Sequence, residues 1–295
     1  MNVPSAPQRP PVSVIRYGDG SARFDVSIVI TFHREGLHAQ WMLDGFRRVR
    51  AHAERAGLRM QLVCVLDQPD DDTLGLVSSH PILVHNDWIL TTRTGDPGTN
   101  RNIGVAYAGG EYIGVADGDD YYSEAWVTAG HALASRYGAS VVVHPEYVVS
   151  FESQHVLARL VDQRDGTYPL ASCLLVHPWV CTAIAHASIF KTTAYLPTNA
   201  RETGFGFEDW HWNLEVLAKG VWHVLARDTA LYYRRKKTSV LVSESAHRAI
   251  VRPTAFFDRP ECWEGGFPLI DDYRIHAKAL PIVEAGSPRP VTVEG

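Results

Sequence analysis

The first half of the chain alternates short apolar, β-branched runs with segments of helical periodicity, and this alternation most restricts its fold. The runs lie at residues 26–31, 60–66 and 111–116. Short continuous apolar runs are typical of parallel strands that are buried on both faces of a sheet. Between the first two, apolar residues recur at helical spacing over 37–53, and Gly57 supplies a stop. The pattern predicts an α/β fold with a mostly parallel central sheet flanked by helices.

The same alternation continues along the chain. We expect a short third strand at 81–84, a helix at 100–108 with Thr99 as its N-cap, a helix at 123–137 and a strand at 139–143. The remaining expected elements are a short helix opened by the acids at 70–72, a helix at 208–219, strands at 221–226 and 230–233, and a helix near 244–251.

Three regions differ in patterning. Residues 1–24 contain several prolines and no apolar run, which is typical of a flexible arm. Residues 25–243 carry the alternating pattern and are expected to form the functional domain. Residues 244–295 are weakly patterned and are treated as a C-terminal extension.

Charge and cysteine content favour a protein of the cytoplasm that does not bind nucleic acid. The 295 residues carry 28 Lys and Arg against 33 Asp and Glu, a net charge of −5, whereas nucleic-acid binding needs a basic face. The four widely spaced cysteines form neither a disulfide framework nor a zinc site. The first residues lack the apolar segment of a secretory signal, so we do not expect one there. Peripheral contact with a membrane surface is left open.

One uncharged stretch, residues 169–190, is about long enough to cross a bilayer. Its two histidines, its prolines and several Ser and Thr lower its hydropathy. We therefore expect buried strands with a loop there and no transmembrane span.

Acidic residues follow three of the expected strands, at the 31–35 turn, at Asp67 and at 117–120. Ligands of open α/β sheets bind beyond the carboxyl ends of the strands, although one acid there is often only a helix cap. The Asp-Gly-Asp-Asp segment at 117–120 is harder to explain structurally, because three neighbouring carboxylates repel one another unless a cation neutralises them. Their hard oxygens suit Mg²⁺ or Mn²⁺. Gly118 lets the backbone turn and a ligand approach closely.

Two later segments carry further candidate chemistry. Residues 204–210 read Gly-Phe-Gly-Phe-Glu-Asp-Trp, in which Glu208 and Asp209 are either ordinary helix-start acids or a general base at the edge of a cleft. A helix dipole lowers a carboxyl pKa, so a base there needs burial or positioning to restore its basicity. The basic run at 234–237 is either solvated surface or a site for a diphosphate.

Taken together, these segments resemble the family 2 glycosyltransferases of the GT-A fold, from about Val26 to Ser239. The resemblance rests on six segments in the right order. They are Val-Ile-Thr-Phe-His-Arg-Glu at 29–35, Val-Leu-Asp at 65–67 with the acids behind it, Arg-Asn-Ile-Gly at 101–104 leading into Gly-Glu-Tyr-Ile at 110–113, the D-x-D pair Asp117 and Asp119, residues 181–191, and Glu208-Asp209.

The resemblance implies a donor site and a metal site. Asp67 would hold the nucleotide base, most consistent with uracil, and Thr31 and Glu35 would line the same pocket. Asp117 would face the ribose and diphosphate, and Asp119 with Asp117 would ligate Mn²⁺ or Mg²⁺. Three further donor-binding residues are expected from the matching motifs, and they are Arg101, Asn102 and Gly118.

The resemblance also implies an inverting mechanism with Asp209 as the base and Glu208 beside it. The donor would be a nucleotide sugar, with UDP expected, and the acceptor a hydroxyl of a glycan, a lipid-linked sugar or a small molecule. Trp179, His186 and Trp210 are candidate acceptor contacts, although Trp is more often part of a core or a cleft wall. The oligomeric state is left open.

The chain departs from the family pattern at one important position. Lys236 stands where a histidine often completes the metal site, and a protonated lysine cannot ligate a metal. We infer that Lys236 contacts the donor diphosphate, so that the dependence on a metal is uncertain.

Two other functions remain as alternatives at this point. A sugar-1-phosphate nucleotidyltransferase would be expected to carry a Gly-rich basic loop after the first strand, where this chain reads Phe-His-Arg-Glu-Gly at 32–36. A catalytically degenerate nucleotide- or carbohydrate-binding module would not need to retain Asp117, Asp119 and Asp209.

Overall fold

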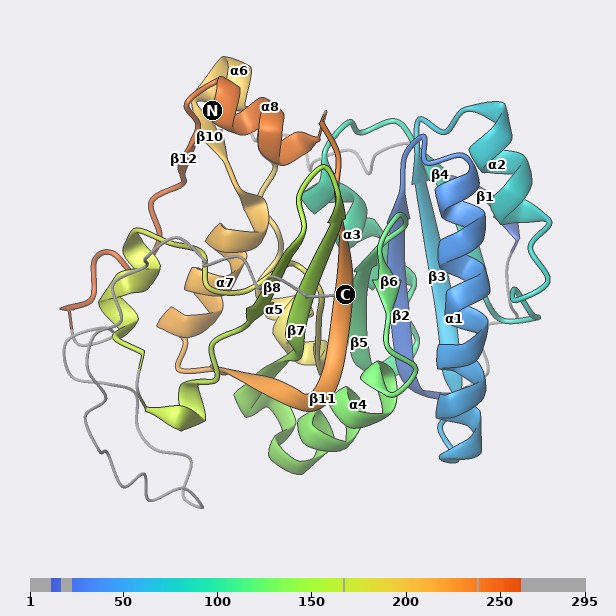
Figure 1. Cartoon of the computed structure of the whole chain (residues 1–295), viewed down its shortest axis with the longest axis horizontal. Helices are drawn as coiled ribbons and strands as arrows, with labels where there is room; N and C mark the ends of the chain where they lie inside the picture. Colours follow the sequence, from blue (N-terminus) through green and yellow to red (C-terminus); the bar gives the residue numbers. More distant parts are fainter. Residues whose placement is uncertain (1–11, 17–22, 167, 238, 261–295) are drawn as a thin grey trace, which may run out of the picture.

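The apolar runs form the centre of a ten-stranded sheet (Figure 1). The structure is a computed structural model that describes residues 12–16, 23–166, 168–237 and 239–260. In spatial order the strands are β1 (Ser13–Arg16), β4 (Trp88–Thr92), β3 (Met60–Asp67), β2 (Phe24–Phe32), β5 (Gly110–Asp117), β9 (Ala183–His186), β7 (Val141–Glu152), β11 (Trp222–Arg235) and β6 (Tyr121–Tyr122), while β8 (Val156–Arg159) pairs with β7. A separate parallel pair joins β10 (Phe205–Gly206) and β12 (Ile250–Val251).

Strand direction divides the sheet into two parts. The strands β4, β3, β2 and β5 are mutually parallel, so their carboxyl ends meet at one edge. Beyond them β9 is antiparallel to both β5 and β7, whereas β7 and β11 are parallel to each other. The α/β fold class with a parallel core is thus confirmed, and the mixed half of the sheet is added by β9.

Helices cover both faces of the sheet (Figure 1). One face packs against α1 (Leu37–Arg55), α2 (Asp71–Ser78) and α4 (Trp126–Tyr137), and the other against α3 (Pro97–Tyr107), α5 (Ala187–Thr192) and α7 (Glu208–Ala218). The short helices are α6 (Ala200–Thr203), α8 (Val240–Ala246) and 3₁₀ turns at Gly138–Ser140, Gln163–Asp165 and Leu170–Leu174.

The alternation of side chains along each strand explains why two cores form. In β2, Ile28 and Ile30 join the cluster under α1, whereas Val29 joins the cluster under α3. In β3, Leu62 and Val63 divide in the same way. Because both faces are buried, every second residue cannot be polar, and the runs are therefore continuously apolar.

The expected strand at 81–84 is wrong, because this segment is a turn and the strand lies further along, at β4. The Ile82 carbonyl accepts a hydrogen bond from Arg50 Nη1 at 2.7 Å, and the Val84 N–H donates to Asp87 Oδ2 at 2.9 Å. The apolar run arises because Ile82 and Leu83 are buried in the core beneath α1.

Other element boundaries shift. Asp96, not Thr99, caps α3, and its carboxylate accepts a hydrogen bond from the Thr99 N–H. The two expected strands at 221–226 and 230–233 form one strand, β11, interrupted by a bulge. The remaining differences are that α4 begins at Trp126, β7 runs from Val141 to Glu152, and α8 ends at Ala246.

Parts of the two expected terminal regions belong to the folded body. Ser13–Arg16, inside the expected arm, pairs antiparallel with β4, because that outer strand of the parallel part offers free backbone groups. Phe256 is buried in a third core with Leu214 and Leu217 of α7. The predictions for residues 1–11, 17–22 and 261–295 lie outside the described residues.

The uncharged stretch at 169–190 is divided among a 3₁₀ turn, a loop, β9 and the start of α5. Among the described residues, no helix combines the length and the apolar character that crossing a bilayer requires.

Arg50 of α1 anchors the turn at 82–87 through a buried ion pair with Asp87, with N–O distances of 2.8 and 2.9 Å. Asp87 also accepts a hydrogen bond from the Leu62 N–H of β3. We expect Arg50→Ala to lower the free energy of unfolding by about 3–5 kcal/mol, because it leaves a buried carboxylate without its partner. Urea denaturation measures this loss.

Arg48 on the same helix is the matched control. Its side chain is 73% exposed and lies 3.7 Å from Glu124. Arg48→Ala is expected to change the free energy of unfolding by no more than about 0.5 kcal/mol. Equal losses in the two variants would contradict the assignment.

Candidate active site

The carboxyl ends of the parallel strands bring three of the expected site residues to one edge. Thr31 of β2 lies opposite Asp117 of β5, and Asp67 ends β3 on the other side of β2. The Thr31 hydroxyl donates a hydrogen bond to Asp117 Oδ1 at 3.2 Å. Parallel pairing thus assembles side chains that are 86 positions apart in the sequence.

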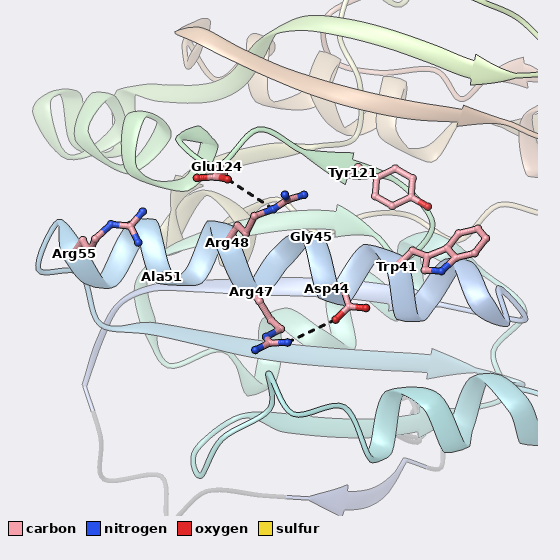
Figure 2. Close-up of a pocket in the computed structure, with 9 residues that line it drawn as sticks. All are labelled: Trp41, Asp44, Gly45, Arg47, Arg48, Ala51, Arg55, Tyr121 and Glu124. Carbon is pink, nitrogen blue, oxygen red and sulfur yellow. Dashed lines mark ion pairs between the residues drawn. The ribbon is translucent and has the colours of Figure 1, made fainter.

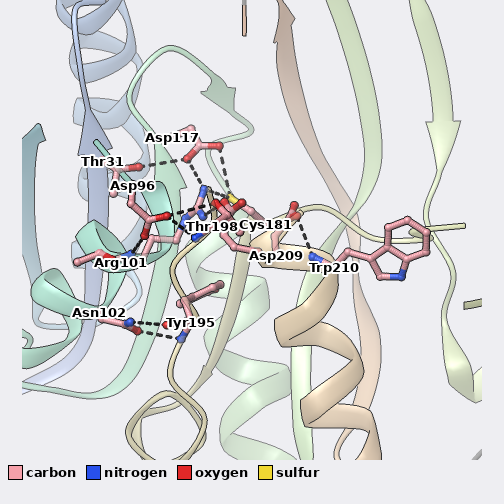
Figure 3. A network of polar contacts seen from close by, with 12 residues as sticks. Thr31, Asp96, Arg101, Asn102, Asp117, Cys181, Tyr195, Thr198, Asp209 and Trp210 are labelled. Carbon is pink, nitrogen blue, oxygen red and sulfur yellow. Dashed lines mark hydrogen bonds and ion pairs between the residues drawn. The ribbon is translucent and has the colours of Figure 1, made fainter. Parts of the chain in front are cut away.

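Arg101 of α3 is the buried centre of the site (Figure 3). Its Nη1 lies 2.5 Å from Glu208 Oε1, and its Nη2 lies 3.2 Å from Asp117 Oδ1 and 3.3 Å from Cys181 Sγ. The side chain therefore joins α3, β5, α7 and the loop before β9. A buried guanidinium is stable only with such charged partners. Arg101 was expected to contact the donor, but in the structure its guanidinium is bound by side chains of the protein itself.

Asn102 holds a loop. Its amide nitrogen donates to the Tyr195 carbonyl at 2.7 Å, and its oxygen accepts from the Tyr195 N–H at 3.0 Å. The loop also hydrogen bonds to Asp96, whose Oδ2 accepts from the Thr198 N–H at 2.7 Å. The amide of Asn102, another expected donor contact, is thus used to position the segment that precedes α6.

Asp67 is 7% exposed, and its two carboxylate oxygens accept three hydrogen bonds. Oδ1 accepts from the Thr94 N–H and the Thr92 hydroxyl, and Oδ2 accepts from the Gly95 N–H at 2.9 Å. Asp67 therefore shapes the loop after β4 at the place where a nucleotide base is expected.

Gly118 is required by packing. A Cβ added there would lie 2.2 Å from the ring of Phe32, which is buried under α1. The close approach expected for a ligand at this glycine is made by an aromatic side chain of the protein.

The acids that follow Asp117 face two cations of β11 and the segment behind it. Asp119 Oδ2 lies 2.7 Å from Lys236 Nζ and 3.5 Å from Arg234 Nη1. Asp120 is 1% exposed, and its Oδ1 accepts a hydrogen bond from the Arg234 N–H. Burial, with the negative charges of Asp119 and Asp117, raises the pKa of Asp120 well above its usual value.

Glu35 belongs to the same electrostatic environment. Burial raises the pKa of its carboxyl group, which accepts a hydrogen bond from the His33 N–H, and the charge of Asp119 raises the pKa further. Lys236 acts in the opposite direction. Glu35 therefore lies near the end of β2 and close enough to Asp119 and Lys236 for both charges to shift its pKa.

Glu208 and Asp209 open α7 as predicted, and their environment differs from that of ordinary helix-start acids. Burial raises the pKa of both carboxyl groups, and the charge of Asp117 raises that of Asp209 further. Glu208 is paired with Arg101, whereas Asp209 has a side chain that is 27% exposed. Burial thus raises the pKa of both acids, and Asp209 is the more exposed carboxylate, which an incoming molecule can reach.

His177 is a neighbour of Asp209 that the sequence did not reveal. Burial lowers the pKa of His177 to about 3, so the ring is neutral. Its Nε2 accepts from the amide nitrogen of Asn213 at 2.7 Å, which leaves the proton on Nδ1, 3.8 Å from Asp209 Oδ2. The neutral ring of His177 therefore lies beside the candidate base, beyond hydrogen-bond distance.

The three candidate acceptor residues lie in different places. Trp210 stacks on His177 at 5.9 Å and lies directly beside Asp209 (Figure 3). Trp179 is 3% exposed, and its indole N–H donates to the Val161 carbonyl, so the expectation that it contacts an acceptor is replaced by a core position.

His186 also lies away from the site. It pairs with Tyr112 across β9 and β5, five residues from Asp117, or roughly 16 Å at about 3.3 Å per residue. Its Nδ1 contacts the Ser188 hydroxyl at the start of α5. Antiparallel pairing reverses the direction of β9, so its end faces away from the carboxyl edge of β5.

Two other site residues were missed. Asp96 is followed by Pro97, and an acid before a proline at the first helical position is a helix-start signal that was available in the sequence. The thiol of Cys181 donates to Asp117 Oδ2 at 3.4 Å. No local sequence pattern predicts this contact, because it depends on the pairing of β9, which follows Cys181, with β5.

A groove of about 650 Å³ lies beside α1 and is lined in part by Arg47, Arg48 and Tyr121 (Figure 2). Arg47 lies 3.9 Å from Asp44, and Arg48 lies 3.7 Å from Glu124. The groove contains none of the expected site residues.

The residues expected to ligate a metal do not fit one. Both oxygens of Asp117 have protein partners, and Asp119 faces the ammonium of Lys236. In the part of the chain that the structure describes, no group of three or more His, Cys, Asp or Glu side chains is arranged to hold a metal ion.

Comparison with known proteins agrees with this geometry. Residues 27–169 match the family model described as glycosyl transferase family 2. Among solved structures, the chain is similar to S. aureus TarS 1–349 in complex with UDP-GlcNAc, with a TM-score of 0.55, 18% identity, and coverage of 79% of this chain and 64% of that chain. It is also similar to the mannosyltransferase PcManGT from Pyrobaculum calidifontis in complex with GDP-Man and Mn²⁺, with a TM-score of 0.50, 15% identity, and coverage of 77% and 62%.

These similarities show the fold, and the expected GT-A fold is confirmed. The chain spans less than two thirds of the length of either structure. No curated protein sequence matches the chain significantly.

Glu244 of α8 provides a pH-dependent test of the packing around the site. Glu244 is only 5% exposed. Its burial, and then the charges of Glu208 and Asp209, raise the pKa of its carboxyl group from 4.5 to about 7. The folded state therefore keeps a proton that the unfolded state releases. This contribution to stability is full below pH 4.5 and is lost as the pH rises through about 7.

We expect Glu244→Gln to become more stable relative to the original chain as the pH rises from 5 to 8, by at most about 1.4 kcal/mol per pH unit. Denaturant unfolding at several pH values measures the difference. Glu202→Gln, at an exposed position of α6, is the control and should show no such trend. A pH-independent difference for Glu244→Gln would contradict the burial of its carboxyl group.

Proposed function

We propose, from the match of residues 27–169 to the model of glycosyl transferase family 2, that the protein transfers a sugar from a nucleoside diphosphate to an acceptor hydroxyl with inversion. The observation that carries the proposal is the position of Asp209. Its carboxylate is partly exposed, has a raised pKa, and lies close enough to Asp117 to sense that residue's charge. This proximity of Asp209 to the carboxyl end of β5 supports a base that acts next to the proposed donor site.

The donor side is formed by the carboxyl ends of β2, β3 and β5. The loop shaped by Asp67 would receive the nucleotide base, and Thr31 with Glu35 would border it. The neighbours TarS and PcManGT are described with UDP-GlcNAc and GDP-Man, which supports a nucleotide sugar as the donor class. UDP is the proposed nucleotide.

We assign Arg101 and Glu208 a positioning role. Their ion pair fixes the first turn of α7 against α3 and holds Asp117 in the same network. Asp209 follows directly in the sequence, so the direction of its carboxylate depends on that pair. The neutral His177 ring lies on the other side of Asp209, with its Nδ1 3.8 Å from Asp209 Oδ2.

The reaction follows from this arrangement. The acceptor oxygen attacks the anomeric carbon of the donor from the face opposite the diphosphate, and a new carbon–oxygen bond forms. The bond to the diphosphate breaks, and its electron pair leaves with the phosphate oxygen. Asp209 takes the proton of the acceptor hydroxyl, and in-line attack inverts the configuration. Trp210 beside Asp209 would offer an aromatic face to the acceptor.

Asp209→Asn tests the base. The amide cannot take a proton, so we expect transfer to fall by about 10²–10⁴-fold while nucleotide binding is retained. Donor turnover and nucleotide affinity are measured on the same preparations. Glu202→Gln at the exposed position on α6 is the matched carboxylate control, and transfer should be unchanged. Full activity of Asp209→Asn would refute the assignment.

A thermal-shift panel of UDP, GDP and their sugar conjugates tests the donor class. A ligand that binds the folded state raises its stability, by about 2.7 kcal/mol at a hundredfold excess over the dissociation constant. We expect UDP and a UDP-sugar to raise the melting temperature. A response to GDP alone would make guanine the base of the donor nucleotide. No response to any of these compounds, with or without Mn²⁺, would refute the transferase proposal.

A further inference from the structure

Two cationic side chains converge on Asp119 from one segment. Arg234 lies at the end of β11 and Lys236 two residues later, and alternate residues of an extended segment point to the same side. The Lys236 ammonium is 2.7 Å from Asp119 Oδ2, and the Arg234 guanidinium is 3.5 Å from the same atom. Arg235, between them, instead lies over the ring of Tyr233 at 4.9 Å.

This arrangement leaves no favourable place for a divalent cation at Asp119. Such a cation would have to displace Lys236 or lie beside it, and ammonium and metal charges repel one another. Asp117 offers no alternative, because Arg101, Thr31 and Cys181 engage its oxygens. The charge of Asp119 is thus balanced by the chain itself.

The ammonium of Lys236 remains available to an incoming anion. An ammonium has three N–H donors, and one is directed at Asp119. The Lys236 side chain is 31% exposed, so its remaining donors can reach a ligand. Arg234 adds a second positive charge, although it also pairs with Glu152. The compact ammonium of lysine and the planar guanidinium of arginine both suit phosphate oxygens.

We propose that Lys236, with Arg234 beside it, takes the place of a divalent metal ion at Asp119, so that the donor diphosphate binds without a metal. The inference rests on the proposed function, because it assigns the charge that the leaving diphosphate meets at the same site. Asp119 is then a positioning residue that holds the Lys236 ammonium at the edge of the sheet.

Isothermal titration of the full chain with UDP and with GDP, in EDTA and in Mn²⁺, tests this inference. The dissociation constant of the nucleotide that binds should be the same in both buffers. Mn²⁺ titrated alone should show no saturable binding to the protein. Lys236→Met, which keeps the length of the side chain without its charge, should weaken binding at least about tenfold in both buffers.

Lys237→Met is the matched control, because Lys237 is the exposed neighbour in the same basic run. It should bind the nucleotide as the original chain does, and the melting temperature of each variant verifies that it is folded. Binding that requires Mn²⁺, or equal losses in the two Lys variants, would overturn the inference and leave the proposed transferase intact. Failure of both nucleotides to bind in either buffer would overturn both.

Discussion

The ion pairs of Arg101 are the interaction on which the rest of the site depends. This guanidinium is 4% exposed and joins Glu208 and Asp117, which come from α7 and β5. A buried charge is tolerated only with partners, so these ion pairs favour the observed packing of α3, β5 and α7. That arrangement places Asp209, the residue after Glu208, beside the acidic end of β5. The need to pair a buried charge thereby positions the carboxylate that we propose as the base.

The same principle governs the Asp117–Asp120 turn, where neighbouring carboxylates are compensated by groups of the protein. Asp119 has the ammonium of Lys236, and burial raises the pKa of Asp120 well above its usual value, which favours its neutral form. Arg234 contributes its backbone N–H to Asp120 and its side chain to Asp119. Mutual repulsion, which suggested an external cation, is relieved here by internal ones.

Sequence patterns predicted the secondary structure correctly where residues close together in the chain decide it. The apolar runs at 26–31 and 60–66 became central strands because they are buried on both faces. The prediction of a strand at 81–84 was wrong because burial alone does not distinguish a strand from a turn. In this turn the side chains of Arg50 and Asp87 form the hydrogen bonds to the backbone that a neighbouring strand would otherwise form. Likewise Trp179 is aromatic and apolar, which suits an acceptor wall and a core equally.

The sequence by itself determined the fold class and the order of the acidic motifs, and it singled out Asp209 as a candidate base, because strand burial and helix-start chemistry are read from residues close together in the chain. Only the tertiary structure decided which groups meet. It brought His177 to Asp209, turned His186 away through the reversed direction of β9, and placed Lys236 on Asp119. The reason is physical: the charge state and role of a buried group depend on neighbours that folding brings from distant parts of the chain.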